Sequence, residues 1–299
     1  MSFCGVIILL GLAAQAIAHG YVATYTVNGV DFEGFRRLDA PPIPNSVGWS
    51  FSTPDEGSVL DISSPDMVCR HDGMAGPASA PISAGQVVDF HWTSADLEHN
   101  PDGWSQGHRG PVITYLAPCN GPCDQVDKTT LRWVKIAEAG LISGLANREG
   151  VWATDLLRQG NNSAMIPTSI APGNYVIRNE IIATHRSNLL EPEFYMACAN
   201  IEVTSGGNDD LSGKGVVATE LYSREDKQLF GFSIYESTDP TWPIPGPPLY
   251  QGASRGDVPD SNNNGRPIAT PTNPEPTPKI EPAPTDNPYL GPCGRAWRA

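Results

Sequence analysis

Beyond residue 18 the sequence has no apolar run that approaches the roughly 20 residues needed for a transmembrane helix. The first 18 residues differ, because an apolar stretch at residues 6–14 is followed by Ala16-Ile17-Ala18, with small residues where a signal peptidase requires them. We therefore expect residues 1–18 to be a signal peptide and the mature chain to begin at His19. The expected product is a soluble protein secreted to the extracellular space.

Basic residues are also scarce. The chain has 19 Lys and Arg against 33 Asp and Glu, which gives a formal net charge of -14 at pH 7. So acidic a chain is a poor electrostatic partner for nucleic acids and for anionic membrane surfaces. We expect neither of them as a partner.

Patterns typical of amphipathic helices are scarce as well, apart from residues 153–158. Short runs of β-branched and aromatic residues, separated by Gly, Pro and Asp turns, instead predict strands. These runs lie at residues 21–28, 58–62, 86–92, 111–117, 131–137, 174–184 and 194–204. Many short strands with few helices indicate an all-β fold, an immunoglobulin- or fibronectin-III-like β-sandwich with long loops.

The composition changes near residue 252. Prolines recur every few residues from there on, among Thr, Asn, Asp and Glu, so residues 253–299 cannot bury a core and should be a disordered tail. Residues 289–299, at the end of this tail, are too few to form a carbohydrate-binding module. The expected folded domain is residues 19–252.

Secretion would expose the chain to oxidation and glycosylation. Cys119 and Cys123 flank an Asn-Gly-Pro turn, which favours a local disulfide over a metal pair because no second pair at zinc-finger spacing exists. Cys69 and Cys198 then form a long-range bridge, and Cys293 is left over. Asn161 begins an Asn-Asn-Ser sequon and is a candidate glycosylation site.

An N-terminal histidine offers a metal two nitrogen ligands, its α-amine and its imidazole Nδ1. Nitrogen ligation of this kind suits copper. A second imidazole is needed opposite the first, and His108 is the best candidate, because it lies in a tight Gly-rich loop leading into a strand. On the strand near residue 195, Glu193 and Tyr195 share one face and Cys198 lies on the other.

Several motifs together resemble the fungal lytic polysaccharide monooxygenases of auxiliary activity family 9, once called glycoside hydrolase family 61. They occur in order between His19 and about residue 252: His19-Gly20-Tyr21, Val27-Asn28-Gly29-Val30, Ser64-Pro65-Asp66-Met67-Val68-Cys69, Gly107-His108-Arg109-Gly110-Pro111-Val112, Gly150-Val151-Trp152-Ala153, Ile170-Ala171-Pro172-Gly173-Asn174-Tyr175, Phe194-Tyr195-Met196-Ala197-Cys198 and Pro245-Gly246-Pro247-Pro248-Leu249-Tyr250.

This resemblance implies one copper ion, held by the amine and imidazole of His19 and the imidazole of His108, with Tyr195 in the axial position. It also implies a His and a Gln beside the copper ligands that hydrogen-bond the oxygen species. His185 matches that His, whereas this chain has Glu193 at the position of the Gln.

The implied reaction is oxidative cleavage of a β-1,4-glucan such as cellulose at C1 and/or C4. It uses O2 or H2O2 and an external electron donor, a small reductant or a secreted redox enzyme. We expect a monomer. Candidate aromatic side chains for stacking on the sugar are Tyr21, Trp49, Trp104 and Tyr250, although sandwich cores use the same residue types.

Glu193 is a chemical departure from the family pattern. Glutamine donates and accepts hydrogen bonds, whereas an ionised carboxylate only accepts them. We hypothesise that Glu193 retunes oxygen activation without abolishing it. Two rival functions are a glycoside hydrolase, for which the motifs supply no carboxylate pair, and a non-catalytic secreted copper-binding or polysaccharide-binding cell-wall protein.

Overall fold

The computed structural model describes residues 20–34, 45–52, 57–94, 96–160, 162–251 and 253. The expected signal peptide, His19, the sequon residue Asn161, and residues 254–299 with Cys293 lie outside these ranges. No helix within the described ranges is long and apolar enough to span a membrane.

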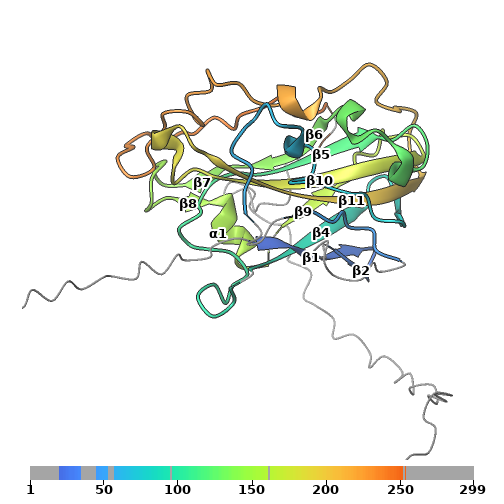
Figure 1. Ribbon diagram of the computed structural model, residues 1–299, viewed down its shortest axis with the longest axis horizontal. Coiled ribbons are helices and arrows are strands. Elements are labelled where there is room, and N and C mark those ends of the chain that lie inside the picture. The colour runs from blue at the N-terminus through green and yellow to red at the C-terminus, as the bar shows by residue number, and fades with distance from the viewer. Residues whose placement is uncertain are drawn as a thin grey trace, which may run out of the picture. The chain divides into compact units, whose positions relative to one another are not determined.

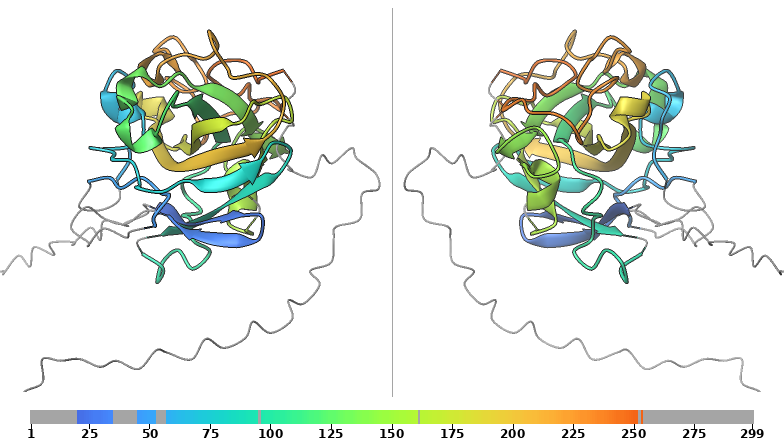
Figure 2. Two further views of the ribbon diagram at one scale, coloured as in Figure 1. Left: turned by 90° about the vertical axis from the view of Figure 1, so that its right-hand side faces the viewer. Right: turned by 90° about the vertical axis from the view of Figure 1, so that its left-hand side faces the viewer.

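Two sheets, mostly antiparallel, pack face to face, as Figures 1 and 2 show. The four-stranded sheet has the order β2-β1-β4-β9, and the five-stranded sheet has the order β3-β11-β10-β5-β6. A separate two-stranded ribbon is formed by β7 and β8. The strands are β1 (Gly20–Val27), β2 (Val30–Glu33), β3 (Ala80–Ser83), β4 (Val87–Ser94), β5 (Val112–Pro118), β6 (Val134–Ala139), β7 (Leu141–Ser143), β8 (Val151–Trp152), β9 (Ser163–Met165), β10 (Gly173–Ala183) and β11 (Glu193–Ser205).

Helices are short. The α-helix within the described residues is α1 (Ala153–Leu157), which matches the expected helix at 153–158. The same part of the chain also contains 3-10 turns: η1 (Pro65–Met67), η2 (Cys123–Gln125), η3 (Lys128–Thr130), η4 (Ser187–Leu189) and η5 (Ala218–Glu220). The β-sandwich expected from the sequence is therefore confirmed.

The five-stranded sheet is buried on both faces. Alternate residues of β11 point in opposite directions: Tyr195, Ala197 and Ala199 join the core between the two sheets, and Phe194, Met196 and Cys198 join a second core on the outer face. Long loops cover that outer face, running above the sheet in Figure 1. The predicted separation of Tyr195 from Cys198 is thus confirmed.

Six of the seven predicted strands are present, with ends shifted by a few residues. Residues 58–62 are not a strand, because Val59 makes only an isolated bridge to Phe194. The reason is local: the Asp61 carboxylate accepts hydrogen bonds from the Ser63 backbone and hydroxyl, which turns the chain. The short strands β2, β3, β7, β8 and β9 are present although the sequence pattern did not predict them.

The expected turn after β1 is present. Asn28 and Gly29 have φ of 54° and 74°, the left-handed pair of a two-residue hairpin. Both expected disulfides are present as well, Cys69–Cys198 and Cys119–Cys123, with sequence separations of 129 and 4. The first ties β11 to the loop that covers the outer face.

We predict that replacing Cys69 and Cys198 together by Ser lowers the free energy of unfolding by about 2–5 kcal/mol, because the bridge closes a very long loop in the unfolded chain. The Cys119–Cys123 pair closes a loop of a few residues, so the matched double Ser variant should cost clearly less. Denaturant unfolding measures both. An equal loss in the two variants would contradict the loop-length explanation.

Candidate functional site

The site lies where three neighbouring strands of the five-stranded sheet end. His108 precedes β5, His185 follows β10, and Glu193 is the first residue of β11. Antiparallel pairing places Ala183 opposite Glu193, and the Thr184 backbone N–H donates to the Arg109 carbonyl over 2.9 Å. Residues far apart in sequence are therefore brought to one edge by strand register.

Glycine makes the close approach of the His108 loop possible. A Cβ built on Gly110 would lie 1.9 Å from the Ile182 carbonyl oxygen, so no other residue fits there without a shift of the backbone. The Gly110 N–H donates to the Thr154 hydroxyl of α1 over 3.2 Å. The loop is thus packed against β10 and hydrogen-bonded to α1, which holds the backbone of His108 in a fixed position.

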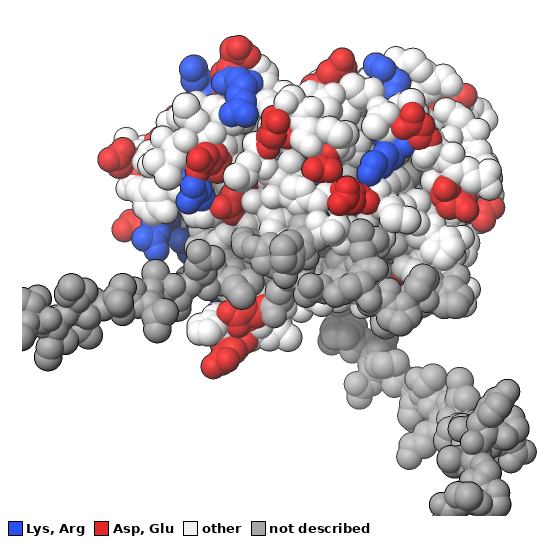
Figure 3. Space-filling model, viewed as in Figure 1, with Lys and Arg blue, Asp and Glu red and all other residues white. Residues whose placement is uncertain are grey.

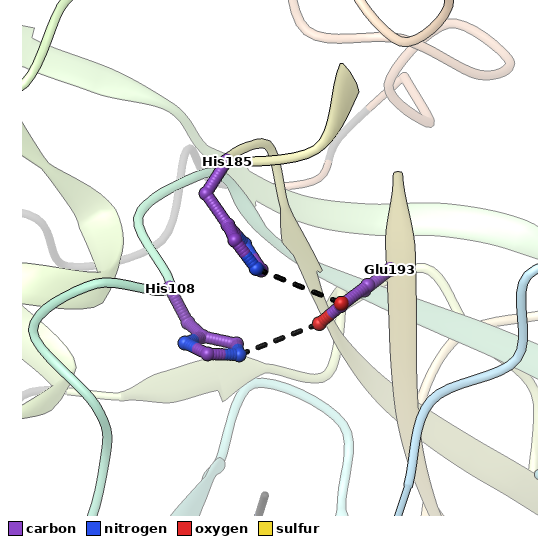
Figure 4. A group of neighbouring side chains, drawn as sticks. All are labelled: His108, His185 and Glu193. Carbon is purple, nitrogen blue, oxygen red and sulfur yellow. Dashed lines mark ion pairs between the residues drawn. The ribbon is translucent and has the colours of Figure 1, made fainter. Parts of the chain in front are cut away.

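The Glu193 carboxylate faces both imidazoles and turns one oxygen toward each, as Figure 4 shows. His108 Nε2 is 3.4 Å from Glu193 Oε2, and His185 Nε2 is 3.6 Å from Glu193 Oε1. The centroids of the two imidazole rings are 4.2 Å apart. One donor atom from each of the three residues lies within 4.8 Å of the others, a spacing at which one metal ion could contact all three.

Tyr195 completes the group from the inner face of β11. Its ring is fully buried, and its hydroxyl donates to Glu193 Oε2 over 2.6 Å. Two residues along a strand return to the same face, so the pair Glu193 and Tyr195 follows from strand geometry. The structure therefore brings together four of the five residues expected at the site, and the fifth, His19, is not among the described residues.

The carboxylate of Glu193 is held ionised. Burial raises its pKa, but the contact with His108, the charge of His185 and the hydrogen bond from Tyr195 lower it further, to about 2. Burial and the neighbouring Glu193 raise the pKa of the Tyr195 phenol well above its usual value. At ordinary pH the site in the metal-free protein thus contains a negative carboxylate beside a neutral phenol.

Trp104 is a structural support of this site. Its indole N–H donates to the His108 carbonyl over 3.0 Å, and its ring meets that of Tyr195 edge-on at 5.0 Å. Gly20 lies against the same ring, because a Cβ there would be 3.2 Å from two Trp104 carbons. Trp104 thus connects His108, Tyr195 and the start of β1.

Arg70 supports the site as well, although the sequence pattern did not point to it. It is fully buried, and it donates to the carbonyl oxygens of Gly20 over 2.8 Å and Gly57 over 3.0 Å. Its guanidinium also lies 5.2 Å from the centre of the Tyr195 ring. The one sequence signal for Arg70 is its place directly after Cys69, at the end of one of the motifs.

Three of the four aromatic residues expected to stack on a sugar do not fit that role. Trp49 and Trp104 are 3% and 1% exposed, so their faces are not available to a polymer. Tyr250 is anchored by hydrogen bonds with Asp209 and Ser169. Those partners lie just beyond the start of β10, about 30 Å from the end that carries His185. Tyr21, partly buried on β1, keeps the role as an expectation.

A surface hollow of about 290 Å³ opens beside the two imidazoles. His108 and His185 line it, together with Arg148 and Tyr235. Tyr235 is 53% exposed, and the Arg148 guanidinium lies 5.8 Å from the centre of its ring. Tyr235 was not predicted because no pattern distinguishes it from a core tyrosine.

On the face drawn in Figure 3, acidic and basic side chains are interspersed without a continuous basic patch.

Comparisons with known proteins find a family profile and relatives that match most of the chain. The sequence profile described as Auxiliary Activity family 9 (formerly GH61) matches residues 19–242. A relative from Malbranchea cinnamomea, described as AA9 family lytic polysaccharide monooxygenase A, is 44% identical over 253 residues, which are 82% of this chain and 72% of the relative.

Solved structures align over the same region. The extended catalytic domain of H. jecorina LPMO9A has a TM-score of 0.68 and 35% identity, covering 84% of this chain and 97% of that one. A structure described as a cellulose-active polysaccharide monooxygenase from M. thermophila has a TM-score of 0.65 and 29% identity, covering 78% of this chain and 100% of that one.

We predict that Glu193→Gln destabilises the metal-free protein in a pH-dependent way. Because the folded-state pKa is lowered to about 2, the carboxylate stabilises the fold at pH values above its unfolded pKa of about 4.3, and this stabilisation is lost as pH falls toward 2. The variant should be less stable by up to about 3 kcal/mol at pH 6, with little difference near pH 2. Denaturant titrations with chelator present measure this, and Glu202→Gln, at an exposed position of β11, is the control. A difference independent of pH would contradict the prediction.

Proposed function

The chain belongs to auxiliary activity family 9, a family of copper-dependent polysaccharide monooxygenases, and from this premise we propose that it cleaves cellulose or a related β-1,4-glucan by oxidation at C1, C4 or both. We propose that it uses O2 or H2O2 and electrons from an external donor. One of the similar solved structures is described as cellulose-active, which supports the choice of substrate.

The observation that carries the proposal is that Gly20, His108 and Tyr195 gather around one side chain, Trp104. Trp104 contacts all three residues, and Arg70 fixes the Gly20 carbonyl. The residue before Gly20 is His19, whose Cα lies about 3.8 Å along the chain from that of Gly20. Its amine and imidazole are thus proposed to reach the copper that His108 binds. The family match beginning at residue 19 supports cleavage after Ala18.

The donor set fits copper. Imidazole nitrogens are good copper ligands, so His108 together with His19 would hold the ion, and the phenol oxygen of Tyr195 would be a further, weaker donor. The Trp104 indole N–H donates to the backbone carbonyl of His108, and this hydrogen bond fixes the backbone that carries the imidazole. A copper ion held there supplies the oxygen chemistry that breaks a sugar C–H bond.

The protein's own contributions are orientation, exclusion of water and charge. The buried rings of Trp104 and Tyr195 close the side of the site that faces the core. His108 and His185 also line the surface hollow, through which a polymer could reach the site. Glu193 Oε2 accepts a hydrogen bond from the Tyr195 hydroxyl, which keeps the phenol oriented.

Tyr235 is proposed to take the role that Trp49, Trp104 and Tyr250 cannot fill. It presents an exposed aromatic face at the edge of the hollow, and Arg148 lies beside it. Aromatic rings and pyranose rings offer flat apolar faces to each other. The proposed setting is extracellular, with residues 1–18 removed and residues 19–252 forming the catalytic domain.

Product analysis tests the proposal. We expect the copper-loaded protein, incubated with phosphoric-acid-swollen cellulose and ascorbate, to release oxidised oligosaccharides that mass spectrometry detects. His108→Ala should lower their yield by at least about 100-fold, since loss of an outer-shell partner of a metal already costs roughly 10–100-fold.

Tyr235→Ala should weaken binding to cellulose while leaving copper binding unchanged.

The same measurements separate this function from its rivals. Tight copper binding without any oxidised product would indicate a copper-binding wall protein. Hydrolytic products that need no ascorbate would indicate a glycoside hydrolase. His99→Ala serves as the control for each assay, because His99 is exposed, pairs with Asp96 and is not part of the group formed by His108, His185 and Glu193.

We further predict that Glu193→Gln changes the rates of peroxide production and of substrate oxidation, together with their dependence on pH. The reason is that the amide restores a hydrogen-bond donor and removes a negative charge beside the metal ligand His108. Rates that match those of the unmodified protein across the pH range would contradict a role of Glu193 in oxygen activation.

A further inference from the structure

We propose that His108, His185 and Glu193 form a second divalent-metal site, which overlaps the copper site at His108 and binds Zn2+ or a similar ion without His19. Binding at these three residues does not depend on the proposed function, whereas the overlap with copper at His108 rests on it. It begins from the geometry of three side chains that all belong to the described residues.

The distances fit ligands of one ion. Two atoms that are each about 2.1 Å from a metal, at the tetrahedral angle, lie about 3.4 Å from each other. His108 Nε2 lies 3.4 Å from Glu193 Oε2 and His185 Nε2 lies 3.6 Å from Glu193 Oε1, both longer than the usual N–H···O hydrogen bond of about 2.7–3.2 Å. One donor atom from each of the three residues lies within 4.8 Å of the other two, so small side-chain movements bring all three onto one ion.

Two other His–carboxylate pairs in the same molecule show the contrast. His71 lies 2.9 Å from Asp66, and His99 lies 2.7 Å from Asp96, both at ordinary hydrogen-bond distance. Each of these pairs contains one histidine, whereas Glu193 faces two imidazole rings through its two oxygens. The arrangement around Glu193 therefore differs from a simple His–carboxylate pair.

The donor set is one that metals use in other proteins. Two histidines and one carboxylate, with positions left open to solvent, bind Zn2+ in catalytic sites and Fe2+ in oxygenases. Glutamine at position 193 would not supply the anionic oxygen that such a site needs. The site thus depends on the departure of this chain from the family pattern.

The surroundings support an ion at this place. The Tyr195 hydroxyl donates to Glu193 Oε2 and orients the carboxylate, as outer-shell partners of metal ligands do. The side chains of His108 and Glu193 are each 12% exposed, and both histidines line the solvent hollow, which gives the ion an entry path. The ends of β5, β10 and β11 hold the three residues before any ion binds.

The two nearest arginines already pair with other carboxylates. Arg186 lies 3.9 Å from Glu193 Oε1, but its guanidinium also binds Glu191. Arg109 at the edge of the hollow is paired with Asp155 at 3.3 Å. The carboxylate of Glu193 is therefore not neutralised by a dedicated arginine partner, and an ion of charge +2 would satisfy it.

Sharing His108 makes the two sites compete. Nε2 of His108 has one lone pair, so it binds one ion at a time. Zn2+ in the proposed site and copper in the His19 site would therefore exclude each other. Zinc should slow copper loading of the protein that starts at His19.

A chain without the copper site provides the test. The full-length mature chain carrying His19→Ala is titrated with Zn2+ by calorimetry, and with Co2+ as a visible-absorption probe. We expect one ion per chain in the His19→Ala protein. Adding Glu193→Gln, which keeps the shape of the side chain, should weaken binding by at least about 100-fold, beyond the usual cost of losing an outer-shell partner.

Further variants keep the test decisive. His185→Gln in the same background should weaken binding as much as Glu193→Gln does, and it replaces that variant if the latter fails to fold. His99→Ala is the matched control and should leave binding unchanged. A crystal soaked in Zn2+ should show anomalous density within about 2.0–2.2 Å of the three donor atoms.

The proposal is overturned if the His19→Ala protein binds neither Zn2+ nor Co2+, or if Glu193→Gln binds as tightly as its parent. It is also overturned if His99→Ala weakens binding equally. None of these outcomes bears on oxidised products from the copper-loaded protein, so failure of this proposal and failure of the proposed function are distinguishable.

Discussion

The register between β10 and β11 is the constraint on which the rest of the structure depends. Eleven consecutive pairs, from Gly173 with Val203 to Ala183 with Glu193, fix which residues of the two strands share a face. A slip by one residue would turn Tyr195 outward and Cys198 inward, and it would break both the disulfide and the site. Stability and chemistry thus rest on the same pairing.

The buried polar groups explain why this register holds. Arg178 and Glu180 on β10 form a fully buried ion pair at 2.9 Å. Arg178 also donates to the carbonyls of Met67 and Val68, next to Cys69 in the covering loop. An isolated buried charge would be strongly unfavourable, so a slipped register, which would move Arg178 away from the Met67 and Val68 carbonyls held to β11 by the Cys69–Cys198 bridge, costs more than the loss of apolar contacts. Arg70 acts in the same way at the start of β1, where it fixes Gly20.

The sequence predicted the sandwich, the disulfides and the grouping of His108, His185, Glu193 and Tyr195 because each has a local or family signal. The strand period gave the shared face of Glu193 and Tyr195, and the motifs gave the two histidines. Burial of single aromatic residues has no such signal, which is why Trp49 and Trp104 were assigned to the surface although both lie in the core. Arg70 and Tyr235 depend on loops that meet only after folding, so no pattern along the chain could identify them.

Glu193, at the position where the family resemblance implies a glutamine, changes the electrostatics of the site more than its shape. A carboxylate and an amide have nearly the same size, and Tyr195 can donate to either. The carboxylate, however, places a full negative charge 3.4 Å from the His108 nitrogen that is proposed to bind copper. A charge so close favours a divalent ion over a monovalent one, because the attraction scales with the charge of the ion and the surroundings are largely shielded from water. With a metal in place, the same carboxylate would strengthen the binding of a divalent ion and would oppose the reduction of copper, and the balance between these two effects would decide whether the residue serves oxygen chemistry or metal selection.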